Sequence, residues 1–153
     1  MRRKEQEITE RAEIEAILSR ATVCHLAFLD GKRPYVVPVC YAYGDNTLYI
    51  HSAPEGHKMD LLRLNPQVCF EVEADVALLP ANSACGWGIR YASVIGWGHA
   101  ASVDDPLEKR AALDAIMAHY GEENSPPYGE GILSRTAIIK VVIESMTGKR
   151  SSK

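Results

Sequence analysis

The sequence predicts a mainly β protein with peripheral helices, built as a largely antiparallel barrel of six strands. Three observations lead to this fold class. Six β-like runs outnumber three helical segments, the first three strands are joined by short turns, and strands and helices do not alternate regularly. A doubly wound parallel sheet needs that alternation, so the pattern excludes it.

The first part of the chain combines one helix with a meander of three strands. A helix is expected over residues 9–20, with apolar residues on one face and Thr9 as its N-cap. Strand-like runs follow at residues 22–29, 34–43 and 47–52. The turns between them, Asp30-Gly31 and Gly44-Asp45-Asn46, suit residues with positive φ, which indicates antiparallel pairing.

A second helix and a fourth strand are expected in the middle of the chain. The helix covers residues 57–64 and ends at Asn65-Pro66, because proline cannot continue it. Residues 67–74 alternate apolar and polar side chains, which is typical of a half-exposed strand with an acidic outer face. The alternation is lost over residues 75–89, so we expect a long loop there that is a candidate for function.

A fifth strand is expected over residues 90–103, where Gly96 and Gly98 mark a close backbone approach or a bulge. The third helix begins at Asp105-Pro106, with aspartate at the cap, proline at the first position and Glu108 at the capping-box spacing. Its buried side is expected to comprise Leu113, Ile116, Met117 and Tyr120.

The remaining segments are an irregular stretch and a final strand. Residues 121–131 show no periodic pattern and are expected to be irregular. Residues 136–145 contain the most β-branched run of the chain, which predicts a central strand.

Length and composition are those of one globular domain, expected over residues 1–153. The chain is 46% hydrophobic and 24% charged, which excludes disordered and low-complexity classes. The net charge of -3 argues against a nucleic-acid binder, which needs a concentrated basic face. Because neither a signal peptide nor a membrane span is recognisable, we expect a cytoplasmic protein with no nucleic-acid or membrane partner.

The four cysteines contain no Cys-x-x-Cys pair and are expected to be reduced thiols. Cys24, Cys40 and Cys69 lie within strand-like runs and are interpreted as packing residues. Cys85 differs because it lies in the Ala84-Cys85-Gly86-Trp87 loop, where it is a candidate reactive thiol.

The five histidines are scattered singly, so no metal site is expected. His25 and His99 are interpreted as barrel-face or surface residues. His119 lies near a helix C-terminus, where a contact with the helix dipole is favourable. His51 and His57 differ from the others because they bracket a turn with unusual chemistry.

That turn has the properties of a phosphate site. A strand ends at His51-Ser52-Ala53, a helix begins near Gly56, and Lys58 lies in its first turn, where a cation opposes the helix dipole. Exposed helix N–H groups, a serine hydroxyl and a lysine ammonium are together suited to phosphate. The alternative interpretation is a capped, solvent-exposed helix without a ligand.

Five sequence blocks occur in a characteristic order. They are Tyr35-Val36-Val37-Pro38-Val39, Leu48-Tyr49-Ile50-His51-Ser52-Ala53-Pro54-Glu55-Gly56-His57-Lys58, Asn65-Pro66-Gln67-Val68-Cys69-Phe70, Tyr91-Ala92-Ser93-Val94-Ile95-Gly96-Trp97-Gly98 and Met146-Thr147-Gly148-Lys149. In this order the blocks resemble the flavin-binding split-barrel proteins related to pyridoxamine 5'-phosphate oxidase, and most of all their nitroimidazole-resistance (Nim) group. The likeness extends from about residue 2 to residue 150 and implies a split barrel.

The resemblance also implies FMN as the cofactor, held in two equivalent clefts between the subunits of a homodimer. The phosphate would lie at the turn before the second helix, the ring edge along the second strand, and Lys149 near the ring, where it would stabilise the charge of reduced flavin. His51 is the candidate catalytic residue, as a positioning or proton-donating group. The implied cofactor-binding residues are Val36, Val37, Pro38, Val39, His51, Ser52, Ala53, Gly56, Lys58, Tyr91, Ser93, Thr147, Gly148 and Lys149.

The activity that the resemblance implies is reduction of small planar electrophiles such as nitroimidazoles by a flavin-dependent reductase. One alternative is an FMN-binding module for storage or sensing, because no nicotinamide-binding fingerprint is present. Another is haem binding with His51 as the iron ligand. Pyridoxamine phosphate oxidation is disfavoured, since the sequence ends at Lys153 without the basic C-terminal segment that those oxidases use on the substrate phosphate.

Overall fold

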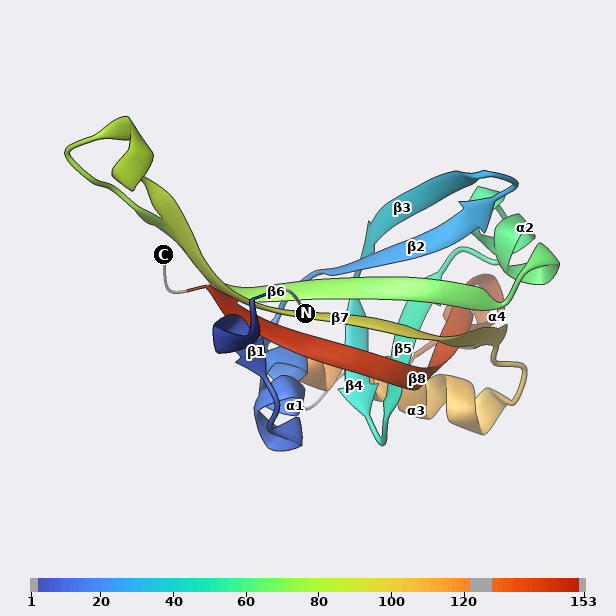
Figure 1. The fold of residues 1–153 in the computed structure, drawn as a ribbon. Coiled ribbons are helices and arrows are strands. Elements are labelled where there is room, and N and C mark those ends of the chain that lie inside the picture. The colour runs from blue at the N-terminus through green and yellow to red at the C-terminus, as the bar shows by residue number, and fades with distance from the viewer. Residues whose placement is uncertain (1–2, 122–127, 152–153) are drawn as a thin grey trace.

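The computed structural model describes residues 3–121 and 128–151 (Figure 1). In these residues eight strands join one antiparallel sheet, with seven in the order β3-β2-β6-β7-β8-β5-β4 and β1 paired with β8. The expected mainly β, antiparallel fold is confirmed, although the sequence predicted six strands. The strands are β1 (Glu7–Ile8), β2 (Cys24–Asp30), β3 (Arg33–Val39), β4 (Tyr41–Gly44), β5 (Thr47–Ser52), β6 (Gln67–Leu79), β7 (Gly88–Ser102) and β8 (Ala137–Ser151).

The helices lie at the periphery of the sheet, as expected (Figure 1). Helix α2 packs against β2, α3 against β4 and β5, and α1 against β6 and β7. They are α1 (Arg11–Arg20), α2 (His57–Leu64), α3 (Pro106–His119) and α4 (Glu130–Arg135), with short 3-10 turns η1 (Lys4–Gln6) and η2 (Ala84–Gly86). Within the described part of the chain, no helix is long and apolar enough to cross a bilayer.

Two helix N-cap residues were predicted, and one of them is wrong. The start of α3 is confirmed, since the Asp105 side chain accepts a hydrogen bond of 2.8 Å from the Glu108 N–H. The start of α1 lies at Arg11, with Glu10 at the N-cap and no capping side chain, so Thr9 is not the cap. The preceding residues pair with β8 as strand β1, which keeps the chain extended up to Glu10.

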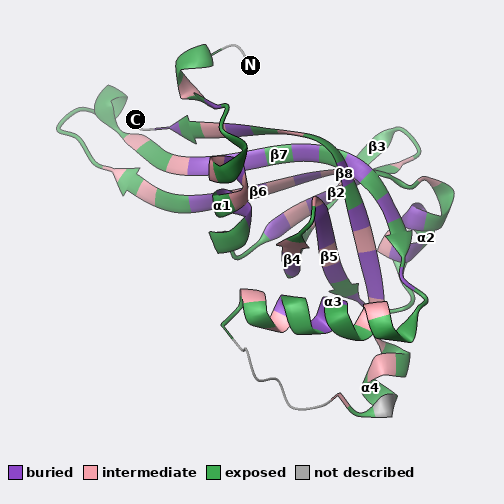
Figure 2. Ribbon diagram, turned by 90° about the horizontal axis from the view of Figure 1, so that it is seen from below, coloured by how far each residue is buried: buried purple, intermediate pink, exposed green. Residues whose placement is uncertain are grey.

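The core lies on the inner face of the sheet, where buried residues follow the central strands (Figure 2). Tyr41 is fully buried, and its hydroxyl donates a hydrogen bond of 2.6 Å to the Leu18 carbonyl, which ties α1 to the sheet. Of the residues expected to bury α3, Leu113 and Ile116 do so, but Tyr120 is 41% exposed. Its hydroxyl donates to the Thr22 carbonyl and accepts from the Tyr41 N–H, so it contacts the backbone before β2 and at the start of β4.

Gly96 and Gly98 have the close backbone approach that the sequence predicts. A Cβ atom at Gly96 would lie 2.3 Å from the Phe70 ring, and one at Gly98 would lie 2.4 Å from the Val142 carbonyl oxygen. The β7–β8 register shifts between Trp97 and Gly98, so the strand pair also carries the expected irregularity.

Residues 75–89, expected to be a loop, are strand at both ends, and the loop is confined to residues 80–87. β6 continues to Leu79 and β7 begins at Gly88, so the two strands project from the body as an arm (residues 75–91, Figure 1). The pairing register of the two strands shifts between Ala74 and Ala77. Beyond the shift, the strands stay paired up to Leu79 and Gly88. The arm does not pack on the core, and Val76 and Leu78 are largely exposed, so no burial pattern marks these strands in the sequence.

The other element boundaries differ in three places. The run 34–43 divides into β3 and β4 at Cys40, which is exposed rather than packed because the chain leaves the sheet there. The last strand extends past residue 145 to Ser151, since it pairs with β7 along its length. In the stretch 121–131, expected to be irregular, α4 begins at Glu130, and residues 122–127 lie outside the described residues.

Candidate functional site

The structure places the expected cofactor residues in two separate groups. The first group lies on β3, the end of β5 and the start of α2, and the second on the adjoining strands β7 and β8. The first comprises Val36, Val37, Pro38, Val39, His51, Ser52, Ala53, Gly56 and Lys58. The second comprises Tyr91, Ser93, Thr147, Gly148 and Lys149.

The first group is held together by contacts between α2 and the β2–β3 hairpin. The His57 Nε2 donates to the Asp30 carboxylate at 3.0 Å, and its ring meets the Tyr35 ring edge-on at 4.9 Å. His57 is thereby a structural link between these elements. At the other end of β3, the pairing of Tyr41 with Ile50 brings the strand's end close to Ser52.

The start of α2 supplies free N–H groups. Gly56 stands at the N-cap with φ 118°, a conformation that side-chain-bearing residues rarely adopt, and no side chain caps the helix. The first amides of a helix have no partner within it. Ser52, the hydroxyl expected to add to these donors, is 8% exposed.

Lys58 is a partly buried cation without a counter-ion. Burial lowers the pKa of its ammonium group, and within residues 3–121 and 128–151 it has no hydrogen-bond or ion-pair partner. The helix dipole also disfavours a cation at this end of α2. An anion bound beside Lys58 and the free amides would relieve both costs. The alternative interpretation was a capped, solvent-exposed helix without a ligand, but no side chain caps the start of α2.

His51 is exposed at the end of β5, opposite Ile138 of β8. It has no hydrogen-bond or ion-pair partner among the residues that the structure describes. Its imidazole is therefore accessible to a ligand next to the α2 terminus.

The edge of β3 offers one backbone N–H to a ligand. This strand is at the end of the strand order, so one edge has no neighbouring strand in the described part of the chain. Pro34 and Pro38 lack an N–H, and a strand proline is accommodated where its nitrogen faces away from the paired strand. Val36 lies midway between them, so its N–H and C=O point to the free edge, and its side chain is 54% exposed.

In the second group, Lys149 is held by Tyr91. Its Nζ donates a hydrogen bond of 2.7 Å to the Tyr91 hydroxyl, and Ser93 lies directly opposite Lys149 on β7. Thr147 and Lys149 point to one face of β8. Gly148 points to the other face, where an added Cβ would lie 2.9 Å from Ile8 and from Ile14, so its lack of a side chain serves the packing of β1 and α1.

Within one chain, the end of the first group at His51 lies far along β8 from the second group. Ile138 lies opposite His51, and Lys149 follows it by eleven residues along β8. At about 3.3 Å per residue this is a distance of roughly 36 Å, far longer than an FMN molecule. One FMN molecule therefore cannot contact both His51 and Lys149 of the same chain.

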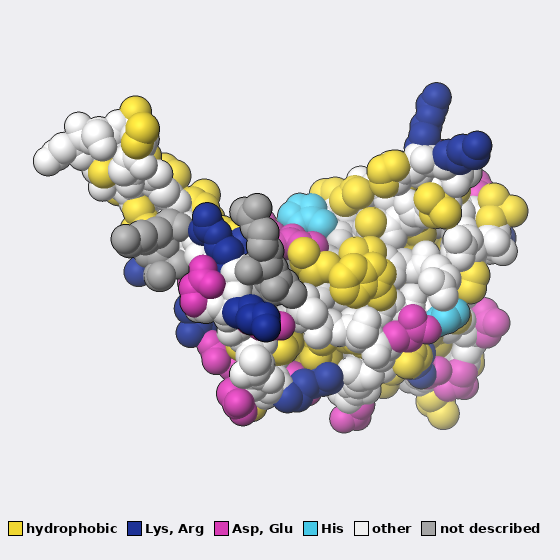
Figure 3. Space-filling view, viewed as in Figure 1, with side chains coloured by type: hydrophobic (Ala, Val, Ile, Leu, Met, Phe, Trp, Pro, Cys, Tyr) yellow, Lys and Arg dark blue, Asp and Glu magenta, His cyan; other side chains and the backbone are white. Residues whose placement is uncertain are grey.

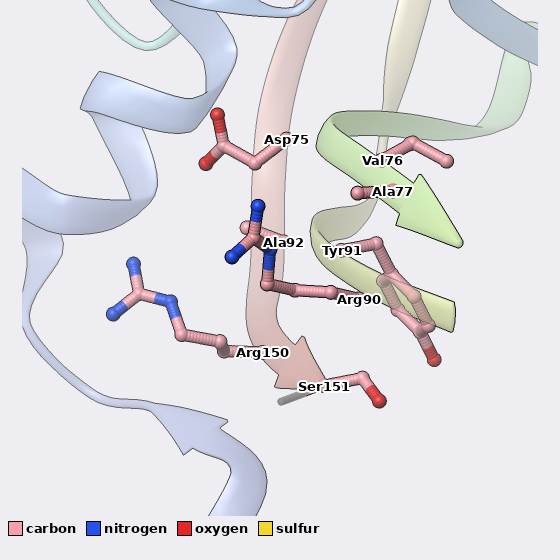
Figure 4. Close-up of a pocket in the computed structure, with 8 residues that line it drawn as sticks. All are labelled: Asp75, Val76, Ala77, Arg90, Tyr91, Ala92, Arg150 and Ser151. Atoms are coloured by element: carbon pink, nitrogen blue, oxygen red, sulfur yellow. The ribbon is translucent and has the colours of Figure 1, made fainter. Parts of the chain in front are cut away.

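A cavity of about 470 Å³ lies at the base of the arm, next to the second group (Figure 4). Arg90 extends toward Asp75 on one side of it, whereas the Tyr91 ring points to the other side (Figure 4). Arg150, which also lines the cavity, pairs with Glu13. Asp75 pairs with Arg20 at 2.7 Å, which holds the pKa of its carboxyl below the usual value.

The structure also assembles a cluster that sequence reasoning missed. His25 of β2 lies beside Glu71 and Glu73 of β6 on the outer face of the sheet. Burial and the neighbouring Glu73 raise the pKa of Glu71 to about 7. The acidic outer face of β6 was predicted, but no local signal pairs His25 with residues forty-six and more positions away.

The remaining histidines and cysteines have structural surroundings. His99 is exposed and paired with Glu144, as expected for a surface residue. His119 donates a hydrogen bond of 2.8 Å to the Ala21 carbonyl, so its role extends beyond the expected dipole contact. Cys24 is buried as expected, and Cys85 is exposed.

Comparison with known proteins gives a match to one protein family. Residues 10–150 match the model of the family described as pyridoxamine 5'-phosphate oxidase. A curated relative, Uncharacterized protein RA0666 of Rhizobium meliloti (strain 1021), is 34% identical over 65 residues, which are 42% of this chain and 42% of that protein. The matched part therefore spans less than half the length of that relative.

Two solved structures illustrate the similarity. A proposed 5-nitroimidazole antibiotic resistance protein from Bacteroides thetaiotaomicron VPI-5482 is 34% identical, with a TM-score of 0.83 over 94% of this chain and 86% of that one. An FAD- and haem-binding protein from Mycobacterium smegmatis is 18% identical, with a TM-score of 0.85 over 97% of this chain and 74% of that one. The second similarity shows the fold alone.

Thiol reactivity should follow the burial of the cysteines. Burial raises the pKa of Cys24 to about 12, so at pH 8 only about one thiol in ten thousand is ionised. We expect Ellman's reagent to modify Cys40 and Cys85 in the folded protein and Cys24 only after unfolding. As a control, Cys85→Ser should remove one rapidly reacting thiol, whereas Cys24→Ser should remove none. Rapid modification of Cys24 in the folded protein would contradict this assignment.

Proposed function

The chain belongs to the pyridoxamine 5'-phosphate oxidase family, and on that premise we propose that it binds FMN between two copies of itself and reduces small planar electrophiles such as nitroimidazoles. The observation that carries the cofactor proposal is the partly buried Lys58 without a counter-ion at the uncapped start of α2. A phosphate dianion fits this position, because amide donors, the dipole and the ammonium all favour negative charge.

The ring would lie along the free edge of β3. There the Val36 N–H and C=O can hydrogen-bond the polar edge of an isoalloxazine ring without adding charge, and the exposed Val36 side chain offers it apolar contact. His51, at the end of β5 before α2, would reach a substrate stacked on the ring.

A second copy of the chain would complete the site. Tyr91 holds the Lys149 ammonium in a fixed place, and in the dimer this cation would come from the partner to the ring. The outer face of the sheet between the two groups also suits a partner, because Ile95 and Trp97 expose 40% and 48% of their surface there. Burial of such residues against a second copy would remove apolar surface from water.

When bound, FMN would supply the electron transfer, and the chain would supply binding, orientation and protons. Lys149 would stabilise negative charge on the ring. His51 would hold a proton at an imidazole nitrogen and donate it to the substrate, since reduction of a nitro group consumes protons. Nitroimidazoles are proposed as substrates because of the similarity to the Bacteroides thetaiotaomicron protein.

Lys58→Ala should weaken FMN binding more than Lys149→Ala, because Lys58 faces a dianion and the charge on the ring is single and delocalised. A charge-assisted contact contributes about 1.5 to 3 kcal/mol, so the loss should be about tenfold to a hundredfold in fluorescence titration. Arg63→Ala, at the exposed far end of the same helix, is the matched control and should bind like the parent. Equal affinity of Lys58→Ala and the parent, or a haem spectrum of the purified protein, would contradict the proposal.

A mixing experiment tests the two-chain site. Lys58→Ala lacks the first group's cation, and the double variant Tyr91→Ala/Lys149→Ala lacks polar groups of the second. If the two are unfolded and refolded together, each mixed dimer contains one intact site, and about a quarter of the parent's high-affinity FMN sites should return. Either a mixture that binds no better than the two variants separately, or parent-like binding by the double variant, would argue for a site within one chain.

His51→Ala should leave FMN bound and the dimer intact while slowing the reoxidation of reduced flavin by a nitroimidazole. Loss of a positioned proton donor reduces such a rate by about a hundredfold or more, measured by anaerobic stopped-flow absorbance. His57→Ala is the matched control on the other side of the turn, and it should affect stability rather than the reoxidation rate. An unchanged rate in His51→Ala would exclude the proton-donor role, and a parent protein that nitroimidazoles cannot reoxidise would exclude the reductase.

A further inference from the structure

Strand register brings an imidazole and two carboxylates together on the outer face of the sheet. His25 of β2 is paired with Glu71 of β6, and Glu73 lies two residues further along, on the same face as Glu71. Figure 3 shows histidine and acidic side chains side by side where this face is hollowed between the arm and strands β2 and β3. In residues 3–121 and 128–151, no other group of three such side chains is arranged to hold a metal ion.

The donor atoms already have the spacing of metal ligands. The His25 Nδ1 lies 3.3 Å from the Glu71 Oε2 and 3.7 Å from the Glu73 Oε2, and one donor atom of each residue lies within 4.8 Å of the others. A zinc ion with bonds of about 2.0 to 2.1 Å in tetrahedral geometry separates neighbouring ligand atoms by about 3.4 Å. Binding would therefore need only small side-chain rotations.

The local charge also favours a cation. Neither glutamate forms an ion pair with a lysine or arginine among the described residues, in contrast to Glu15, which pairs with Arg11, and Glu108, which pairs with Lys140. In this part of the chain, the ion pairs of the two carboxylates are with His25. Other histidine–carboxylate pairs of the protein, such as His99–Glu144, contain a single carboxylate.

The site has room for a further ligand. A cavity of about 250 Å³ adjoins the two glutamates and is lined also by Val76, Ile89 and Tyr91. The side chains of His25, Glu71 and Glu73 remain 33% to 39% exposed, so an ion can reach them. Three protein ligands and one open position are the arrangement of many accessible zinc sites.

We propose that His25, Glu71 and Glu73 bind one divalent transition-metal ion, joining β2 to β6 on the outer face. Imidazole nitrogen favours Zn²⁺ over Mn²⁺, and both over Mg²⁺, which prefers oxygen ligands alone. The proposal does not depend on the flavin site, since none of the three residues belongs to either cofactor group.

Isothermal titration calorimetry with ZnCl₂, MnCl₂ and MgCl₂ tests the site in the full chain without a histidine tag. We expect one Zn²⁺ per chain, weaker Mn²⁺ binding and no measurable Mg²⁺ binding. His25→Ala and Glu73→Gln should each weaken Zn²⁺ binding by at least about tenfold. Loss of a residue that only orients a metal ligand already weakens metal affinity by about this much, and His25 and Glu73 would be ligands themselves. His99→Ala removes a more exposed cross-strand histidine with one carboxylate partner and should leave binding unchanged.

Thermal unfolding provides a second readout. Zn²⁺ should raise the melting temperature of the parent and of His99→Ala, and much less that of His25→Ala, because an ion that binds only the folded state stabilises it. Glu73→Gln keeps the proposal testable if His25→Ala does not fold. Absence of stoichiometric Zn²⁺ binding, full binding by both site variants, or binding that Cys40→Ser abolishes would overturn the assignment.

Discussion

The long pairing of β7 with β8 is the constraint on which the rest of the structure depends. Each strand has 15 residues, and together they run from the base of the arm to the strand end beside β5. Gly98 leaves no Cβ against the Val142 carbonyl of β8, and Gly96 leaves none against the Ser145 carbonyl of β8 or the Phe70 ring of β6. Its length separates His51 from Lys149 by eleven residues of β8, so one chain cannot bring both side chains to a single FMN molecule.

The three lysines near the sheet differ in how their charge is balanced. Lys140 pairs with Glu108 at 2.7 Å, and Lys149 is held by the Tyr91 hydroxyl. Lys58 has neither an anion nor a hydrogen-bond acceptor among the described residues, although it is partly buried at a helix N-terminus. A buried cation normally acquires a partner, because desolvation penalises the charged form. The imbalance at Lys58 therefore points to a ligand more directly than the presence of a lysine does.

Sequence predicted the features that depend on neighbouring residues and missed those that depend on distant ones. The cap of α3 and the extent of α2 follow from local chemistry, and both were predicted. The arm was missed because its strands bury neither face, so Val76 and Leu78 show no contrast with polar neighbours. In the candidate site, the residues around Lys58 were predicted from the sequence of a single turn between a strand and a helix. Their separation from Lys149 depends on the register of β8, which no local pattern contains.

The pleat of the sheet places two proposed sites on the outer face, and a second copy would couple them. Alternation directs Thr147 and Lys149 outward and Gly148 inward, and the same rule directs Glu71 and Glu73 outward beside His25. If a partner covers this face, the metal ligands lie at the rim of or within the interface. An ion bound there would then stabilise the dimer by the same free energy with which dimer formation strengthens ion binding, because linked equilibria are reciprocal. The proposed cofactor site, which needs both chains, would gain occupancy from that linkage without any contact between metal and flavin.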